Sequence, residues 1–244
     1  MTALLAVFQR ELAAYFATPL AYVFIIIFLV LAGVATFQLG SFWERGQADL
    51  NSFFQFHPWL YLFLVPAISM RLWAEERRGG TIELLMTLPV PIWSAVAGKF
   101  AAAWAFTGIA LLLTLPLWVT VSNLGEPDHG AIAAGYVGSF LMAGGFLAIG
   151  SMLSAATKSQ VIALVLSTVV CFVLLMIGFG PFTSQLDGIL PLPLVETIAR
   201  FSFISRFDSI SKGVIDLSDL VYFGALITCA LVANAIIIDL RKAS

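Results

Sequence analysis

The sequence predicts an all-α membrane protein, a single transmembrane domain with six membrane-crossing helices over residues 1–244. Hydrophobic residues make up 61% of the chain, charged residues 11%, and the mean hydropathy is +1.01. Soluble domains carry about 25% charged residues, and a soluble fold of this length could not bury so much apolar surface. Six apolar stretches also approach the roughly 20 residues that a helix needs to cross the hydrocarbon layer. These observations make lipid the expected solvent of the chain.

The six apolar stretches differ in length and in the residues that interrupt them. The second is short, contains Pro66 and meets Arg71 at its end, whereas the third is long and has Lys99 near its start. The fourth is rich in glycine, and small residues let helix backbones approach closely in lipid. The predicted spans are, approximately, residues 20–39, 58–73, 92–121, 131–157, 160–180 and 220–238.

The basic residues predict which side of the membrane each loop faces. Cytoplasmic segments of membrane proteins carry an excess of lysine and arginine. If both termini are cytoplasmic, eight of the twelve basic residues lie inside. Three of the other four belong to one long external loop, and long loops obey the rule least well. We therefore expect a multi-pass protein with both termini in the cytoplasm.

Residues 1–16 predict a short helix that lies in the membrane interface. Leu4, Leu5, Phe8 and Leu12 share one helical face, while the polar residues of this segment lie elsewhere. An apolar face opposite a polar one is typical of a helix at the membrane surface. The alternative is that this segment simply extends the first span.

Residues 181–219, between the fifth and sixth spans, predict an external re-entrant segment. Three prolines and eight charged residues make it too polar to cross the membrane, yet many of its other residues are apolar. Irregular backbone is tolerated at membrane depth only where protein or water satisfies its polar groups. We therefore expect short external helices that dip into the edge of the bilayer.

Residues 74–91, between the second and third spans, predict a short helix on a charged stem. Four consecutive charges, Glu75 to Arg78, mark the point where the second span reaches water. Two glycines then interrupt the helix, because glycine adopts backbone angles that other residues avoid. Thr81 can cap a new helix, and two prolines end it before the third span. The expected result is an amphipathic helix at the cytoplasmic membrane surface.

A family resemblance rests on the sequence of this loop, Glu76-Arg77-Arg78-Gly79-Gly80-Thr81-Ile82-Glu83-Leu84-Leu85-Met86-Thr87-Leu88-Pro89. The loop resembles the first cytoplasmic loop of ABC-2 type transporter permeases, in which a Glu-rich stem precedes Gly-Thr, an acidic residue, Leu-Leu and a later Pro. The six spans and the segments Gln9–Leu12 and Arg206–Asp216 extend the resemblance along the chain, most closely to gliding-motility-associated permeases and to those for nitrous oxide reductase maturation. Two glycines stand where the family usually has one, a departure expected to loosen the stem.

The resemblance implies a coupling helix that sits in a cleft of a separate ATPase subunit. The implied ATPase-coupling residues are Thr81, Ile82, Glu83, Leu84, Leu85, Met86, Thr87 and Leu88. The implied stem residues are Glu75, Glu76, Arg77, Arg78, Gly79 and Gly80. The resemblance also suggests that the stem connects to the interfacial helix through Arg10 or Glu11.

The resemblance further implies an assembly in the bacterial cytoplasmic (inner) membrane. Two permeases, identical or homologous, would work with two copies of the ATPase, and the substrate, expected to be exported, would pass between the permeases. ATP and magnesium would bind to the ATPase, so no cofactor is expected in this chain. The net charge of −2 and the lack of a basic block give no reason to expect a nucleic-acid partner.

Three other functions compete with an ATP-driven permease. A charged loop alone is typical of a solvated membrane anchor. An intramembrane enzyme needs a nucleophile with a base, or a metal site, but His57 and His129 are the only histidines and are expected in solvated loops at external span ends. A secondary transporter needs an ionisable residue inside a span, where we expect none. The nucleotide loop Gly-x4-Gly-Lys-Ser/Thr does not occur, so no catalytic residue is expected.

Overall fold

The computed structural model describes residues 2–80, 91–186 and 199–240, and this part of the chain is helical, without strands. Four of the predicted spans are confirmed as apolar helices long enough to cross a membrane. They are α2 with its π-helical end η1 (Pro19–Val34 and Ala35–Leu39), α8 with α9 (Ile92–Leu112 and Leu115–Leu124), α10 (His129–Ala156) and α15 (Leu217–Leu240).

The two other predicted spans form shorter helices. Residues 160–180 form the apolar helix α11 (Gln160–Met176), which has 17 residues. Residues 58–73 form α5 (His57–Ser69), which has 13 residues, and the start of α6 (Arg71–Gly79). Six crossings therefore stay a prediction, because these two helices fall short of the length that a straight crossing requires.

The remaining helices of the described chain are short or lie at its edges. They are α1 (Ala3–Phe16), α3 (Phe42–Arg45), α4 (Asn51–Gln55), α12 (Gly180–Leu186) and α14 (Phe203–Ser211).

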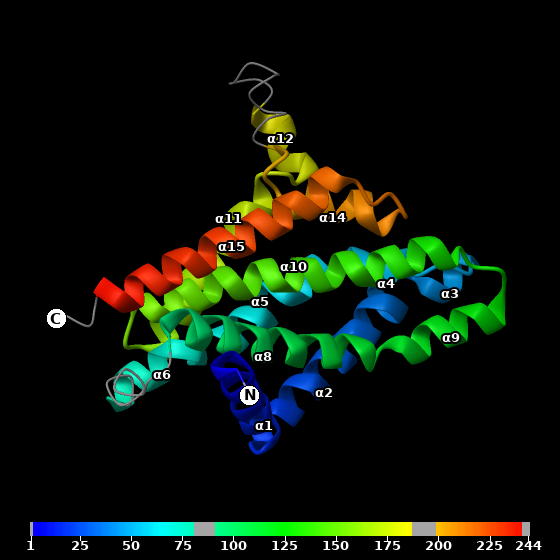
Figure 1. The fold of residues 1–244 in the computed structure, drawn as a ribbon. Helices are drawn as coiled ribbons and strands as arrows, with labels where there is room; N and C mark the ends of the chain where they lie inside the picture. Colours follow the sequence, from blue (N-terminus) through cyan, green and yellow to red (C-terminus); the bar gives the residue numbers. More distant parts are fainter. Residues whose placement is uncertain (1, 81–90, 187–198, 241–244) are drawn as a thin grey trace.

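Helix α10 is the centre of the molecule (Figure 1). Its most apolar stretch is 78% buried, against 28% for the first spanning helix, and it packs against α5, α8, α11, α14 and α15. The glycines expected to allow close packing do so. A Cβ atom added at Gly138 would lie 2.7 Å from Ile210, and one at Gly144 would lie 2.8 Å from Trp104. These contacts are closer than any side chain at either position would permit.

The outer helices α2, α11 and α15 present large apolar side chains to the surroundings. Ile26, Val30, Val161 and Val169, for example, are each more than half exposed. A monomeric soluble protein rarely exposes apolar surface on this scale. The exposed faces agree with the prediction that lipid surrounds the bundle.

The connections gather at two opposite ends of the bundle (Figure 1). Helix α6, the turn between α10 and α11, and the end of α15 lie at one end, while α3, α4 and the turn between α9 and α10 lie at the other. This separation matches the two sets of loops assigned from the basic residues. The charged stem is thus at the same end as the described C-terminal residues.

The predicted external re-entrant segment is described at residues 181–186 and 199–219. Its helix α14 packs against α10, where Phe203 stacks on Phe146 with ring centroids 4.5 Å apart. Arg206 also forms an ion pair of 2.7 Å with Asp219 at the start of α15. The α14 part of this segment is therefore packed into the bundle, whereas α12 projects from it (Figure 1).

Candidate functional site

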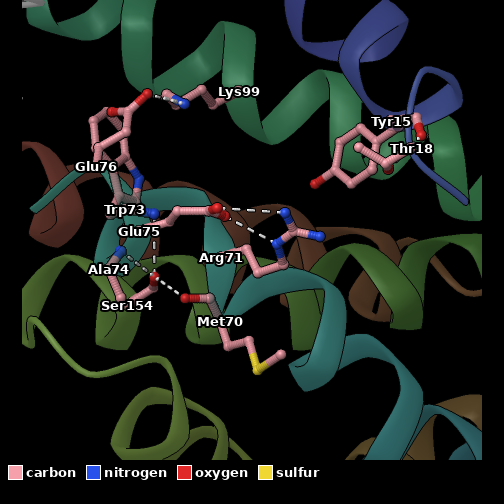
Figure 2. A network of polar contacts seen from close by, with 10 residues as sticks. All are labelled: Tyr15, Thr18, Met70, Arg71, Trp73, Ala74, Glu75, Glu76, Lys99 and Ser154. Atoms are coloured by element: carbon pink, nitrogen blue, oxygen red, sulfur yellow. Dashed lines mark hydrogen bonds and ion pairs between the residues drawn. The ribbon is translucent and has the colours of Figure 1, made fainter. Parts of the chain in front are cut away.

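The stem helix α6 begins at a break that another helix stabilises. Pro66 lies inside α5 and has no N–H group to donate to the preceding turn, and α5 ends at Ser69, so the chain breaks at Met70 before α6 starts. Ser154 of α10 fills the break (Figure 2): its hydroxyl accepts hydrogen bonds from the N–H groups of Trp73 and Ala74, at 3.1 and 3.0 Å, and donates one to the carbonyl of Met70, at 2.8 Å. The first turn of α6 is thus capped by a side chain from α10.

Lys99 joins the stem to two other helices. It lies on α8 and is only 3% exposed. Its Nζ atom is 2.7 Å from a carboxylate oxygen of Glu76 on α6 and 3.2 Å from one of Glu11 on α1, and it lies 5.3 Å from the centroid of the Trp73 ring. A buried ammonium is stable only when its charge is paired. The single amine therefore holds α1, α6 and α8 together.

Helix α1 approaches α8 through a face that differs from the expected one. Val7 is its buried residue, and it packs where Gly98 leaves room, since a Cβ at Gly98 would lie 2.9 Å from the Val7 side chain. Leu4 and Leu5, expected on the apolar face, are each 40% exposed. The residues facing α8 follow one side of the helix, while the leucines remain available to lipid.

Glu11 is ionised at neutral pH. Burial raises the pKa of its carboxyl, but the charge of Lys99 and the hydrogen bonds from Arg10 and Lys99 outweigh this, and the pKa is lowered overall. Arg10 donates to Glu11 at 2.6 Å. Both candidate residues of the interfacial helix thus belong to the group around Lys99.

Some of the other stem residues contact the bundle, and others face water. Arg77 donates to the carbonyl of Ala155 on α10 at 2.7 Å, while Arg71 and Glu75 form an ion pair of 2.9 Å one turn apart on the outer face. Gly80 ends α6 with φ of +69°, a left-handed conformation that glycine adopts without strain. The expected break after the stem is therefore confirmed at Gly80.

The structure brings together the stem and the interfacial helix, but it does not describe residues 81–90. The expected coupling residues, Thr81 to Leu88, lie outside the described residues. The connection between stem and interfacial helix runs through Lys99, which the sequence reasoning did not assign to the site. Its signal was visible, since it is a lone charge inside an apolar stretch, and such residues are usually functional or paired. Ser154 gave no such signal, because serine is common among the small residues of α10.

His57 does not lie in a solvated loop, as expected from the sequence, but is fully buried at 0% exposure. Its Nδ1 atom is 2.8 Å from the hydroxyl of Ser139 on α10, which is itself 2.9 Å from the hydroxyl of Tyr61. The rings of Phe53 and Phe54 surround the imidazole. Because this group has no exposed surface, it packs α5 against α10 and offers a substrate no access.

His129, by contrast, is exposed at the start of α10 and accepts a hydrogen bond of 3.0 Å from the Trp118 indole. The expectation of a surface position is confirmed for this histidine. In the described ranges, no three His, Cys, Asp or Glu side chains are grouped so that they could hold a metal ion.

Comparison with known proteins places the stem within a recognised family segment. Residues 60–232, well over half of the chain, match the family model described as ABC-2 family transporter protein. The chain is also 33% identical over 72 residues to heme exporter protein B of Rhodobacter capsulatus and, to the same extent, to that of Paracoccus denitrificans. Each alignment covers 29% of this chain and 33% of the relative. The chain thus spans about a third of the length of these relatives.

Proposed function

Because the chain belongs to the ABC-2 transporter protein family, whose membrane permease domains have no ATPase site, we propose that it is the membrane-spanning permease of an export-type ABC transporter. In this proposal a separate ATPase subunit hydrolyses ATP, and the permease moves a substrate across the bacterial cytoplasmic membrane. The two partially matching relatives are exporters by name, heme exporter protein B, which supports the outward direction.

The observation that carries the proposal is the anchoring of α6. Directly before residues 81–88, this helix contacts α1 and α8 through Lys99, and α10 through Ser154 and Arg77. A force applied at the loop would therefore reach α8, which follows the loop directly, and also α1 and α10, which are distant from it in sequence. Rigid, packed contacts of this kind transmit small displacements, because cores are not continuously deformable.

The residue roles in this proposal come from the family resemblance and are supported by the anchoring of α6. Residues Thr81 to Leu88 would contact the ATPase, and α6 would act as the lever that carries its movement into the bundle. Two ATPase copies would bind ATP and magnesium, and a second permease copy, identical or homologous, would complete the substrate route. The end of the bundle that holds α6 and the end of α15 would face the cytoplasm, with the exposed leucines of α1 at the membrane surface.

The coupling role is tested by a double substitution, Glu83→Ala with Leu84→Asp. The change removes an acidic and an apolar residue from the proposed ATPase contact, so co-purification of the ATPase in mild detergent, measured by mass spectrometry, should be lost. Membrane insertion should be unaffected, because the substitutions lie outside the spanning helices.

The matched control makes the same two chemical changes at the opposite end of the bundle. Leu124 and Glu126 are both exposed in the connection between α9 and α10. Leu124→Asp with Glu126→Ala should leave ATPase co-purification unchanged. Unaltered co-purification of the Glu83 and Leu84 variant would count against the coupling role.

A further inference from the structure

A polar cleft opens where α1 meets α6 and α8. It has a volume of about 170 Å³, and its lining includes Glu11, Tyr15, Thr18, Arg71 and Glu75. Figure 2 shows Tyr15 and Arg71 on opposite sides of this space, with the hydroxyl end of Tyr15 pointing toward the arginine. The cleft lies beside α1, whose leucines are exposed, and hence at the expected level of lipid headgroups.

An apolar groove lies next to the cleft. It is shallow, with about 20 Å³ of free space, and is lined by residues of α2, α5 and α8, among them Phe28, Ile68 and Phe106. Tyr15 of the cleft stacks on Phe106 of the groove with centroids 4.9 Å apart, and Leu72 of the cleft follows Ile68 of the groove by four residues. The polar space therefore adjoins an apolar one, beside the lipid-exposed face of α2.

The cleft is lined by equal numbers of positive and negative side chains, which differ in how far they are exposed. Two cations, Arg71 and Lys99, stand against two carboxylates, Glu11 and Glu75. The Lys99 side chain is 4% exposed and already holds two carboxylates, whereas the side chains of Arg71 and Glu75 are 33% and 52% exposed. The partly exposed pair can thus exchange its mutual contact for a ligand that carries one charge of each sign.

We propose that this cleft and groove form a binding site for a zwitterionic phospholipid with a primary ammonium in its headgroup. The Arg71 guanidinium binds the phosphate, because its planar donors match phosphate oxygens, and the Tyr15 hydroxyl adds a hydrogen bond. Glu75 accepts hydrogen bonds from the ammonium, and an acyl chain lies over the shallow apolar groove, against the exposed apolar side chains of α2. The bound lipid fills the space between α1 and the stem helix α6 and so stabilises their packing. This site is independent of the proposed ATPase contact and stands if that contact fails.

The site is tested by native mass spectrometry of the purified full chain, titrated with phosphatidylethanolamine, with phosphatidylglycerol, or with phosphoethanolamine, which has no acyl chains. Phosphatidylethanolamine should bind more tightly than phosphatidylglycerol, which lacks the ammonium. Arg71→Gln should weaken its binding about tenfold, the effect of losing one charge-assisted hydrogen-bonding partner. Glu75→Gln should reduce the preference for phosphatidylethanolamine over phosphatidylglycerol.

Arg78→Gln is the matched control, because Arg78 lies on the same helix, is exposed and does not line the cleft. It should leave lipid binding unchanged. If Arg71→Gln fails to fold, Arg71→Lys keeps the charge but loses the planar donor pair, and it should give an intermediate affinity.

Three outcomes would overturn the proposal. One is binding of phosphatidylglycerol as tightly as phosphatidylethanolamine, and another is an equal loss in Arg78→Gln and Arg71→Gln. The third is binding of phosphoethanolamine as tightly as the lipid, because the groove would then contribute nothing and the ligand would be a soluble phosphate ester.

Discussion

Lys99 carries a charged amine into the space between three helices. A lysine at the centre of a membrane helix costs roughly 3 kcal/mol on insertion scales. Here Glu11, Glu76 and the face of the Trp73 ring surround the amine. Two carboxylates and an aromatic ring offset the loss of hydration. The same contacts make the lysine a tie between helices that the chain connects only through long intervening segments.

Replacing this amine by an apolar side chain of similar length should loosen the tie. Lys99→Met leaves two carboxylates facing one another without the cation between them, and both are partly exposed, so we expect a loss of about 2 kcal/mol in stability. Thermal unfolding of the purified protein in detergent measures the change.

Lys158→Met is the control for this substitution, because Lys158 is exposed in the turn between α10 and α11. Its effect should stay within about 0.5 kcal/mol, as for other surface changes. Equal unfolding temperatures for the two variants would show that the amine is not a tie.

At the scale of the elements, α6 is a short helix held by its neighbours. Nine residues are too few for a stable helix in isolation. In its first turn, a backbone N–H group donates a hydrogen bond to the Ser154 hydroxyl. In its last turn, the Arg77 side chain donates one to the carbonyl of Ala155. Both ends of α6 are therefore fixed to the same turn of α10. The position of α6 therefore depends on the end of α10.

Ser154→Ala should release the first turn of α6. The substitution leaves the buried N–H groups of Trp73 and Ala74 without the hydroxyl, and unsatisfied buried donors cost about 1–3 kcal/mol. Amide hydrogen exchange at these two residues should become faster, and the unfolding temperature should fall.

Ser122→Ala removes an exposed hydroxyl from α9 and is the matched control. Exchange at Trp73 and Ala74 should be the same in this variant as in the wild type. A Ser154→Ala protein with unchanged exchange at both amides would contradict the capping role.

Hydropathy alone predicted the long helices, because a helix in lipid must satisfy its own backbone and so appears as a continuous apolar run. The break between α5 and α6 was only partly visible. Pro66 could be read from the sequence, whereas the capping hydroxyl comes from a residue more than 80 positions away. The amphipathic period of α14, with Phe203, Phe207 and Ile210 on one face, was visible in the sequence, but the sequence did not show that this face packs against α10.

The sequence indicated the separate parts of the candidate site, but not how the stem and α1 are connected. The charges of the stem and Glu11 were recognised from the loop sequence and its resemblance. That one lysine joins them depends on the crossing of α1 over α8 at Gly98, which no local pattern specifies. His57 was misplaced for a related reason, because the aromatic residues that bury it come from separate helices.

At the scale of the whole molecule, the two ends of the bundle should lie in different compartments. A single cysteine at Asp128, introduced by Asp128→Cys after Cys171→Ala and Cys229→Ala, should react with an impermeant thiol reagent in intact cells. Asp128 is exposed at the start of α10, at the end opposite α6. Labelling is measured by the mass shift of the purified protein.

Arg78→Cys, made in the same background, reports on the other end. It should react only after lysis, because the positive-inside rule places the stem in the cytoplasm. The reverse pattern, with Arg78→Cys labelled first, would invert the topology and remove the stem from the reach of a cytoplasmic motor.

The close contacts along α10 restrict how this permease can change shape. A rotation of α10 would carry other residues of the helix into the spaces where Trp104 and Ile210 now contact bare glycine backbone. These close contacts therefore fix the rotation of α10 relative to its neighbouring helices. In the proposed transport cycle we therefore expect α10 to keep its position and the peripheral helices to move, so that a passage for cargo opens on the outside of the single chain.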